Sequence, residues 1–184
     1  MHIVHRGFDT ITLAIQATLP EKLYEHLKAE KERAEELNDT VPISYGGVDL
    51  DLKQYGGQGY AFILQGGSLD PVWFFKRPNP KDPWGVRVTL GSTLLATQGL
   101  GFGRAYIERT LDRLGIKFGA HQVSIARADY CVDILAPDFE LIPENFVCHS
   151  HAVRSDHLTV EDEVDIRSSG KSGRFTSVTL GKMP

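Results

Sequence analysis

The stretch QVSIARADYCVDIL, residues 122–135, alternates in character and is rich in β-branched and aromatic residues, which predicts a β-strand. Successive side chains on a strand point to opposite faces. One face would therefore carry a polar row: Ile125, Arg127, Asp129, Cys131 and Asp133. The other would carry Ala126, Ala128, Tyr130, Val132 and Ile134. We expect this second set to be an ordinary core face on a central strand of the sheet.

The polar row is open to two interpretations, because buried charges are costly unless they are paired or bound to a metal. In the first, Arg127 and Asp129 form a structural ion pair and Asp133 is solvated on an open face. In the second, the two aspartates form a small acidic site for a divalent cation, beside an arginine that faces a phosphate. Alternation alone does not choose between them.

The composition is that of an ordinary globular domain. The chain has 184 residues, of which 41% are hydrophobic and 24% charged, enough for one domain with a sizeable core. The two cysteines, Cys131 and Cys148, have no C-x-x-C spacing, which leaves a reducing cytosol as the expected compartment. No apolar run approaches the length of a membrane span, and the N-terminus has no signal-peptide pattern.

Strands far outnumber helices along the chain and do not alternate with them. Helices are expected after Pro20 and at residues 104–114, the second following a turn at residues 99–103. Strands are expected at 8–15, 48–54, 60–65, Val72–Phe75, Val86–Leu90, 122–135, 145–154, 157–166 and 175–180. This order predicts an α+β fold with a largely antiparallel sheet and two main helices.

The formal net charge of -4 does not indicate a nucleic-acid partner, because DNA-binding domains more often carry a basic surplus. Basic residues nevertheless gather in two places, at Lys76, Arg77, Lys81 and Arg87, and again at Arg167, Lys171, Arg174 and Lys182. Lys76, Arg77 and Lys81 lie in or beside a proline-rich loop, which is the best candidate for contact with a phosphate backbone, and Arg174 belongs to a later basic group. A proline-rich loop with three cations can also be no more than a surface loop.

The order of features resembles the replication initiation factors of rolling-circle plasmids and filamentous phages. In that family a strand of the form R-x-D-x-x-x-D follows a helix, as Arg127, Asp129 and Asp133 do here. WGVRVTLGSTLL at residues 84–95 also looks like the family, and TSVTLGK at residues 176–182 is similar to a T-x-Y-x-G pattern. The resemblance extends from about residue 8 to the end of the chain.

The resemblance implies a fold similar to the HUH-like Rep nucleases and a bacterial cytoplasmic protein that nicks one strand of a replication origin. A tyrosine would attack the phosphodiester, and a divalent metal, Mg²⁺ or Mn²⁺, would polarise the phosphoryl oxygens. Asp129 would be the first metal ligand and Asp133 a second or outer ligand, while Arg127 would contact the scissile phosphate or orient Asp129. Origin DNA, single- or double-stranded, is the implied partner, and a homodimer is a further option.

Two departures from the family pattern matter. Thr179 stands where the late hairpin would present a tyrosine, and the family's downstream Y-D-K-x-x-E segment does not occur before Pro184. We therefore expect residues 1–184 to be one initiator-like domain truncated at its C-terminal end and inactive as a nickase by itself. Tyr130 is not a substitute, because alternation points it away from Asp129.

Three alternatives stay open. His149 and His151 form a His-x-His pair that could hold a metal on one face of a strand, or could be ordinary exposed polar residues. The chain could be a non-catalytic DNA-binding or regulatory module of a mobile element, which Thr179 and the net charge favour. It could also be a soluble α+β protein unrelated to DNA, with a structural Arg127–Asp129 pair.

Overall fold

The computed structural model describes residues 1–67, 69–139, 166–168 and 176–178. The chain divides into two compact units, one formed by residues 2–135 and the other by Met1 with residues 136–184. The first unit contains a seven-stranded sheet and two helices. The α+β class and the antiparallel sheet predicted from the sequence are thus confirmed.

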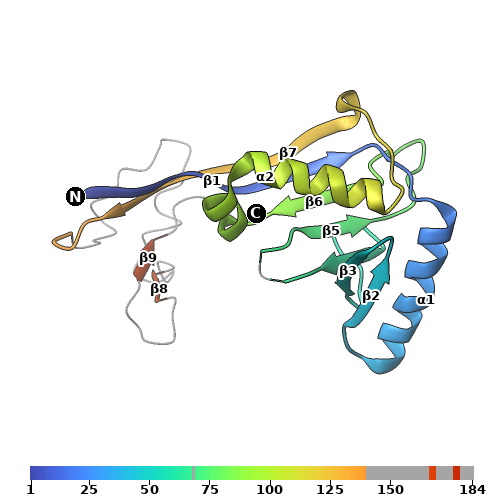
Figure 1. Cartoon of the computed structure of the whole chain (residues 1–184). Coiled ribbons are helices and arrows are strands. Elements are labelled where there is room, and N and C mark those ends of the chain that lie inside the picture. The colour runs from blue at the N-terminus through green and yellow to red at the C-terminus, as the bar shows by residue number, and fades with distance from the viewer. Residues whose placement is uncertain (68, 140–165, 169–175, 179–184) are drawn as a thin grey trace. The chain divides into compact units, whose positions relative to one another are not determined.

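All neighbours in the seven-stranded sheet are antiparallel, in the order β2-β3-β4-β5-β6-β1-β7 (Figure 1). The bounds of its strands are β1 His2–Ile15, β2 Val41–Tyr45, β3 Val48–Leu52, β4 Phe62–Gln65, β5 Val72–Phe75, β6 Val86–Leu90 and β7 Val123–Leu135. In the second unit, β8 (Ile166–Ser168) pairs antiparallel with β9 (Thr176–Val178). The strand β2 was not predicted from the sequence.

Both helices contribute to a single apolar core on one face of the sheet. Helix α1 (Glu21–Leu37) begins directly after Pro20, as predicted, and buries Leu23, Leu27 and Ala34. These side chains belong to one cluster with the strand residues Val41, Leu52, Leu64, Trp73 and Val88. The strand register aligns those five residues with one another and with Leu13 of β1, so they share a face.

Helix α2 (Ser92–Arg113) starts earlier than predicted. A turn was expected at residues 99–103. The helix is interrupted at Gly99 alone, whose φ of 79° and ψ of 167° are not helical, and residues 100–103 already belong to the helical segment that follows. Gly103 fits here because its Cα lies against the core: an added Cβ would be 2.9 Å from a methyl of Leu90. Glycine-rich sequence therefore marks a kink and a close helix–sheet contact instead of a loop.

The first and last strands of the sheet form a long two-stranded arm. β1 pairs with β6 only from Ile11 to Ile15, but it pairs with β7 along nearly its whole length. The part of β1 before Ile11, with its partner residues of β7, continues past the N-terminal end of α2 (Figure 1). The strand expected to be central is therefore an edge strand of this sheet.

The predicted core face of β7 is wrong. Tyr130 is 63% exposed and Val132 and Ile134 are each 49% exposed. These residues pair with the part of β1 before Ile11. That part of the arm extends beyond α2 (Figure 1). Alternation identified the apolar face correctly, but burial depends on a covering element that local sequence does not report.

Candidate functional site

Three irregularities in the β1–β7 pairing decide which side chains share a face. The register shifts between Ile3 and His5, between Phe8 and Thr10, and between Thr12 and Leu13. At the last of these, Thr12 pairs with Arg127 and Leu13 with Ile125, so Ala126 is the extra residue of a β-bulge. Directly paired residues share a face, and therefore Ile125 and Arg127 lie on opposite faces. The expected polar row does not include Ile125.

Arg127 and Asp129 lie together on the face of the sheet opposite the helices. Their paired residues are Thr12 and Thr10, and Thr12 shares a hydrogen bond of 3.0 Å with Thr89 on β6. Nη2 of Arg127 lies 2.6 Å from Oδ2 of Asp129, and Nε donates a hydrogen bond of 2.8 Å to the same oxygen. The two side chains are 54% and 34% exposed, so the pair lies at the surface.

Asp9 is the second carboxylate at this pair. It is the extra residue between Phe8 and Thr10, and Thr10 is the partner of Asp129. The hydrogen bond and charge of Asp129 raise the pKa of the Arg127 guanidinium, and the charge of Asp9 adds to this effect. The pKa of the Cys131 thiol is raised by desolvation, then by the charge of Asp133 and then by the charge of Asp9. Asp129 therefore contacts the guanidinium of Arg127 directly, whereas Asp9 acts on it from the neighbouring strand through its charge.

Asp133 lies further along the arm, opposite His5. It is four residues from Asp129 on an extended strand, a span of about 13 Å at 3.3 Å per residue. Two carboxylates at that separation do not bind one ion directly, because metal–oxygen distances are about 2–2.6 Å. Among the residues the structure describes, no group of three or more His, Cys, Asp or Glu could hold a metal ion. Asp9 is the better placed companion for Asp129.

The cations of the proline-rich loop have partners within the protein. Nζ of Lys76 contacts Asp82 and lies 4.5 Å from the centre of the Tyr60 ring, and its side chain is only 14% exposed. Arg77 pairs with Glu21 and Glu25 and stacks on Tyr24 at 4.0 Å. Lys81 is exposed. The Arg77 contacts join the loop to α1, whereas Lys76 is held by Asp82 of the loop and by Tyr60, which precedes β4. A phosphate would have to compete with these contacts.

A further arginine belongs to the first basic group of the sequence but was not predicted as a site residue. Arg87 of β6 pairs with Ala14 in the register, which places it on the same face as Arg127. Its guanidinium lies 5.5 Å from the centre of the Phe74 ring. Its Nε is buried without a hydrogen-bond partner, and it forms no ion pair within the described part of the chain. Its signal in the sequence was a lone cation in an apolar strand, VRVTL.

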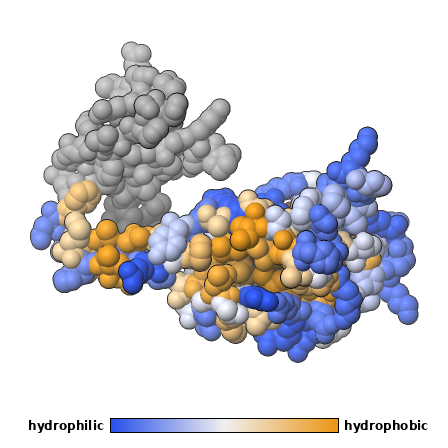
Figure 2. Space-filling model, turned by 90° about the horizontal axis from the view of Figure 1, so that it is seen from above, coloured by the Kyte–Doolittle hydropathy of each residue, from blue (hydrophilic) through white to orange (hydrophobic). Residues whose placement is uncertain are grey.

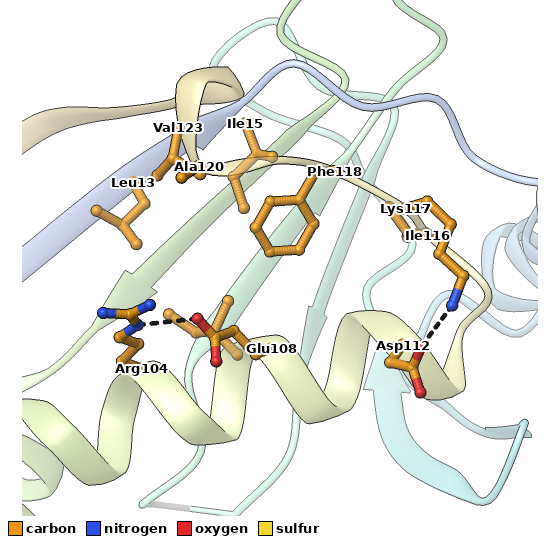
Figure 3. Close-up of a pocket in the computed structure, with 11 residues that line it drawn as sticks. Leu13, Ile15, Arg104, Glu108, Asp112, Ile116, Lys117, Phe118, Ala120 and Val123 are labelled. Atoms are coloured by element: carbon orange, nitrogen blue, oxygen red, sulfur yellow. Dashed lines mark hydrogen bonds and ion pairs between the residues drawn. The ribbon is translucent and has the colours of Figure 1, made fainter.

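The helix face of the same strands borders a separate cavity of about 560 Å³. Its walls are apolar side chains of α2, β1 and the connection to β7, including Leu13, Ile107 and Phe118 (Figure 3). The rim carries two ion pairs, Arg104 with Glu108 and Lys117 with Asp112 (Figure 3). Since each cation already has an anionic partner, the cavity offers no unpaired charge for a ligand and is separate from Arg127 and Asp129.

Several predictions from the sequence lie outside the described residues: Cys148, His149, His151, Arg174 and Thr179, the strand expected at 145–154, and all but the last residue of the strand expected at 157–166. The site just described is therefore built from β1, β6 and β7 alone. No helix in the described part of the chain is long and apolar enough to cross a membrane. Compared with known proteins, the chain matches no family model, no curated protein and no solved structure.

Proposed function

We propose that the chain is a DNA-binding replication initiation protein of the rolling-circle type, working in the bacterial cytoplasm, in which the sheet face carrying Arg127 and Asp129 takes part in metal-assisted nicking. The observation that carries this proposal is the contact of Asp129 with Arg127, to which Asp9 on the neighbouring strand adds its charge. Mg²⁺ is commonly bound by one or two carboxylates together with the phosphates of a substrate. Two carboxylates and a phosphate-facing arginine are the set that such chemistry needs.

The ion pair gives the site a way to respond to DNA. Asp9 and Asp129 would hold Mg²⁺ or Mn²⁺, which polarises a phosphoryl oxygen when it is bound. When the metal ion replaces the guanidinium of Arg127 as the partner of Asp129, Arg127 would be free to contact a phosphate. An arginine binds a phosphate through two parallel hydrogen bonds. Asp133 would not bind the metal ion directly; it would interact with the ion through water or through its negative charge. The attacking tyrosine is not assigned among the described residues.

Arg87 supports a nucleic-acid partner more strongly than the loop cations do. It lies on the same sheet face as Arg127 and has no anionic partner within the described residues. An arginine in this position can neutralise a phosphate without first breaking an internal ion pair. Lys81 remains an exposed candidate, whereas Lys76 and Arg77 would contribute only after release from Asp82 and Glu21.

Metal binding is the first test. Mn²⁺ titration of the chain, followed by electron paramagnetic resonance, should show one site, and Asp129→Asn and Asp9→Asn should each lower its affinity at least about tenfold. Asp51→Asn, an exposed carboxylate on β3, is the matched control. Unchanged Mn²⁺ affinity in Asp129→Asn would show that the Arg127–Asp129 pair is only structural.

DNA chemistry is the second test. The native product of the gene should relax supercoiled plasmids that carry fragments of its own replicon, with a covalent 5′ adduct, and Asp129→Asn should not. Residues 1–184 should bind the same fragments. Arg87→Gln should weaken that binding and reduce the dependence of log affinity on log salt by about one.

A second candidate is favoured by one observation. Two nitrogens of Arg127 are already bonded to Asp129, which is how a structural pair on an exposed strand would look. In that case the chain is a non-catalytic DNA-binding or regulatory module, which would not nick DNA, and Asp129→Asn would leave its DNA affinity unaltered.

A further inference from the structure

We propose that the outer edge of β7 is the surface through which two copies of the chain associate, by antiparallel pairing of residues 127–133 with the same residues of the second copy. This inference is independent of the proposed nicking function. It rests on the exposure of the strand, on the charges along it and on the contrast between the two edges of the sheet.

The two edges of the sheet are very different. β2, at one end, has five residues and contains Pro42, which lacks an N–H and so blocks strand addition. β7, at the other end, has 13 residues, contains no proline and has β1 as its only neighbour among the described strands. Long unprotected edges present unpaired N–H and C=O groups that pair readily with another strand.

The arm is also unusually apolar for an exposed surface. Ile3, Val4, Phe8, Tyr130, Val132, Ile134 and Leu135 are all exposed, by between 37% and 64%. Figure 2 shows hydrophobic surface along the arm as well as on the body of the unit. Phe8 and Tyr130 pack edge to face, with ring centres 5.7 Å apart, so the apolar surface is ordered. Exposed apolar surface of this kind marks interaction sites.

The sequence of β7 is complementary to itself in one antiparallel register. A two-fold axis that passes through Tyr130 perpendicular to the sheet pairs residue i of one copy with residue 260 − i of the other. Residues that pair in this way lie on the same face of the combined sheet. The resulting pairs are Tyr130 with Tyr130, Asp129 with Cys131, Ala128 with Val132, and Arg127 with Asp133. Apolar side chains meet apolar ones, and the only cation of the segment meets an anion.

The bulge at Ala126 limits this pairing. On the N-terminal side of Ala126 the odd-numbered residues change face, because Ile125 lies on the helix face whereas Arg127 lies on the opposite one. Continuation of the register would bring Ile125 opposite Leu135, a residue on the other face. Bulges commonly end strand pairing at sheet edges. Each copy would therefore contribute seven residues, and the assembly would close as a dimer without extending into a fibre.

Charge reversal tests the register. In sedimentation over a dilution series, the wild-type chain should be a dimer. Arg127→Asp and Asp133→Arg should each raise the dimer dissociation constant at least about tenfold, because like charges would face each other twice per dimer. The double variant Arg127→Asp/Asp133→Arg should restore the dimer. Lys28→Asp and Glu36→Arg, exposed on α1, are the matched controls and should leave it unchanged.

A cysteine placed on the two-fold axis gives a second readout that does not depend on charge. With Cys131→Ser and Cys148→Ser as background, Tyr130→Cys should oxidise to a disulfide-linked dimer. Directly opposed Cβ atoms lie about 4.5–5.5 Å apart, so a small inward shift brings them to the separation of about 3.5–4.5 Å found in a disulfide. Ser124→Cys, on the same strand but outside the paired segment, should not. A wild-type monomer at every concentration would overturn the proposal, as would a dimer that all these variants leave intact.

Discussion

Two consecutive glycines, Gly46 and Gly47, close the turn between β2 and β3, and both have positive φ angles, of 60° and 74°. Such a turn matches the right-handed twist of the strands it joins. The two positions differ in their surroundings. A Cβ at Gly46 would lie 2.2 Å from the carbonyl oxygen of Arg113 at the end of α2, whereas a Cβ at Gly47 would meet nothing within 4 Å.

Gly46→Ala should therefore destabilise the protein by more than about 2 kcal/mol, since the strained backbone and the clash with α2 act together. Gly47→Ala should cost only about 1 kcal/mol, the price of the positive φ alone. Urea unfolding of both variants measures the difference. Equal losses would show that the turn moves away from α2 at little cost.

Ala126 shows how one residue changes the interpretation of a strand. Without a bulge, Ile125 would share a face with Arg127, and the row would begin two residues earlier, at Ile125. A one-residue change of register moves every following side chain to the other face. The alanine itself carries no pattern that distinguishes a bulged residue from a regular one, so only the pairing with β1 reveals it.

At the level of elements, one hydrogen bond ties α2 to the connection between β4 and β5. The hydroxyl of Tyr106 donates to Oδ1 of Asp70 at 2.7 Å. Partial burial, followed by this hydrogen bond and the charge of Asp70, raises the pKa of Tyr106 to about 12. The neutral phenol is the form that the folded state favours, whereas the unfolded chain releases its proton near the ordinary value of 10.0.

Stability should therefore fall as pH rises from about 10 to about 12, because the unfolded state loses this proton first. Below pH 10 the contribution of Tyr106 is fully present, and above pH 12 it is lost. Tyr106→Phe should show a smaller decrease over that window than the wild type does. Chemical unfolding of both proteins at several pH values makes the comparison; parallel curves would mean that Tyr106 is solvated in the folded state.

The strands β5 and β6 were predicted with the bounds that the structure shows, and α1 begins where Pro20 indicated. These elements have periodic or continuous apolar sequences with clear turn residues at their ends. The arm was predicted less well. β1 is longer than expected because its first half, HIVHRG, has no alternating pattern and is held only by its pairing with β7.

At the level of the whole molecule, the core lies within one unit. Every member of the main apolar cluster falls between Ile11 and Ile116. A fragment of residues 1–136 contains all of these side chains, together with the complete seven-stranded sheet. This unit should therefore fold without the rest of the chain.

The fragment 1–136 should unfold cooperatively, with a melting temperature within a few degrees of that of the intact chain, because the core that drives folding is unchanged. Differential scanning calorimetry of the two proteins measures this. A fragment without a cooperative transition would show that residues 137–184 contribute directly to the stability of the sheet.

The sequence by itself determined the class of fold, the position of most strands and the gathering of Arg127, Asp129 and Asp133 on one short segment. These features follow from the period of side chains along a chain, which is a local property. Only the tertiary structure decided that β7 is an edge strand, that Asp9 accompanies Asp129, and that Lys76 and Arg77 are held by internal anions. Such facts depend on contacts between residues far apart in the sequence, and a local pattern carries no record of which strand lies beside which.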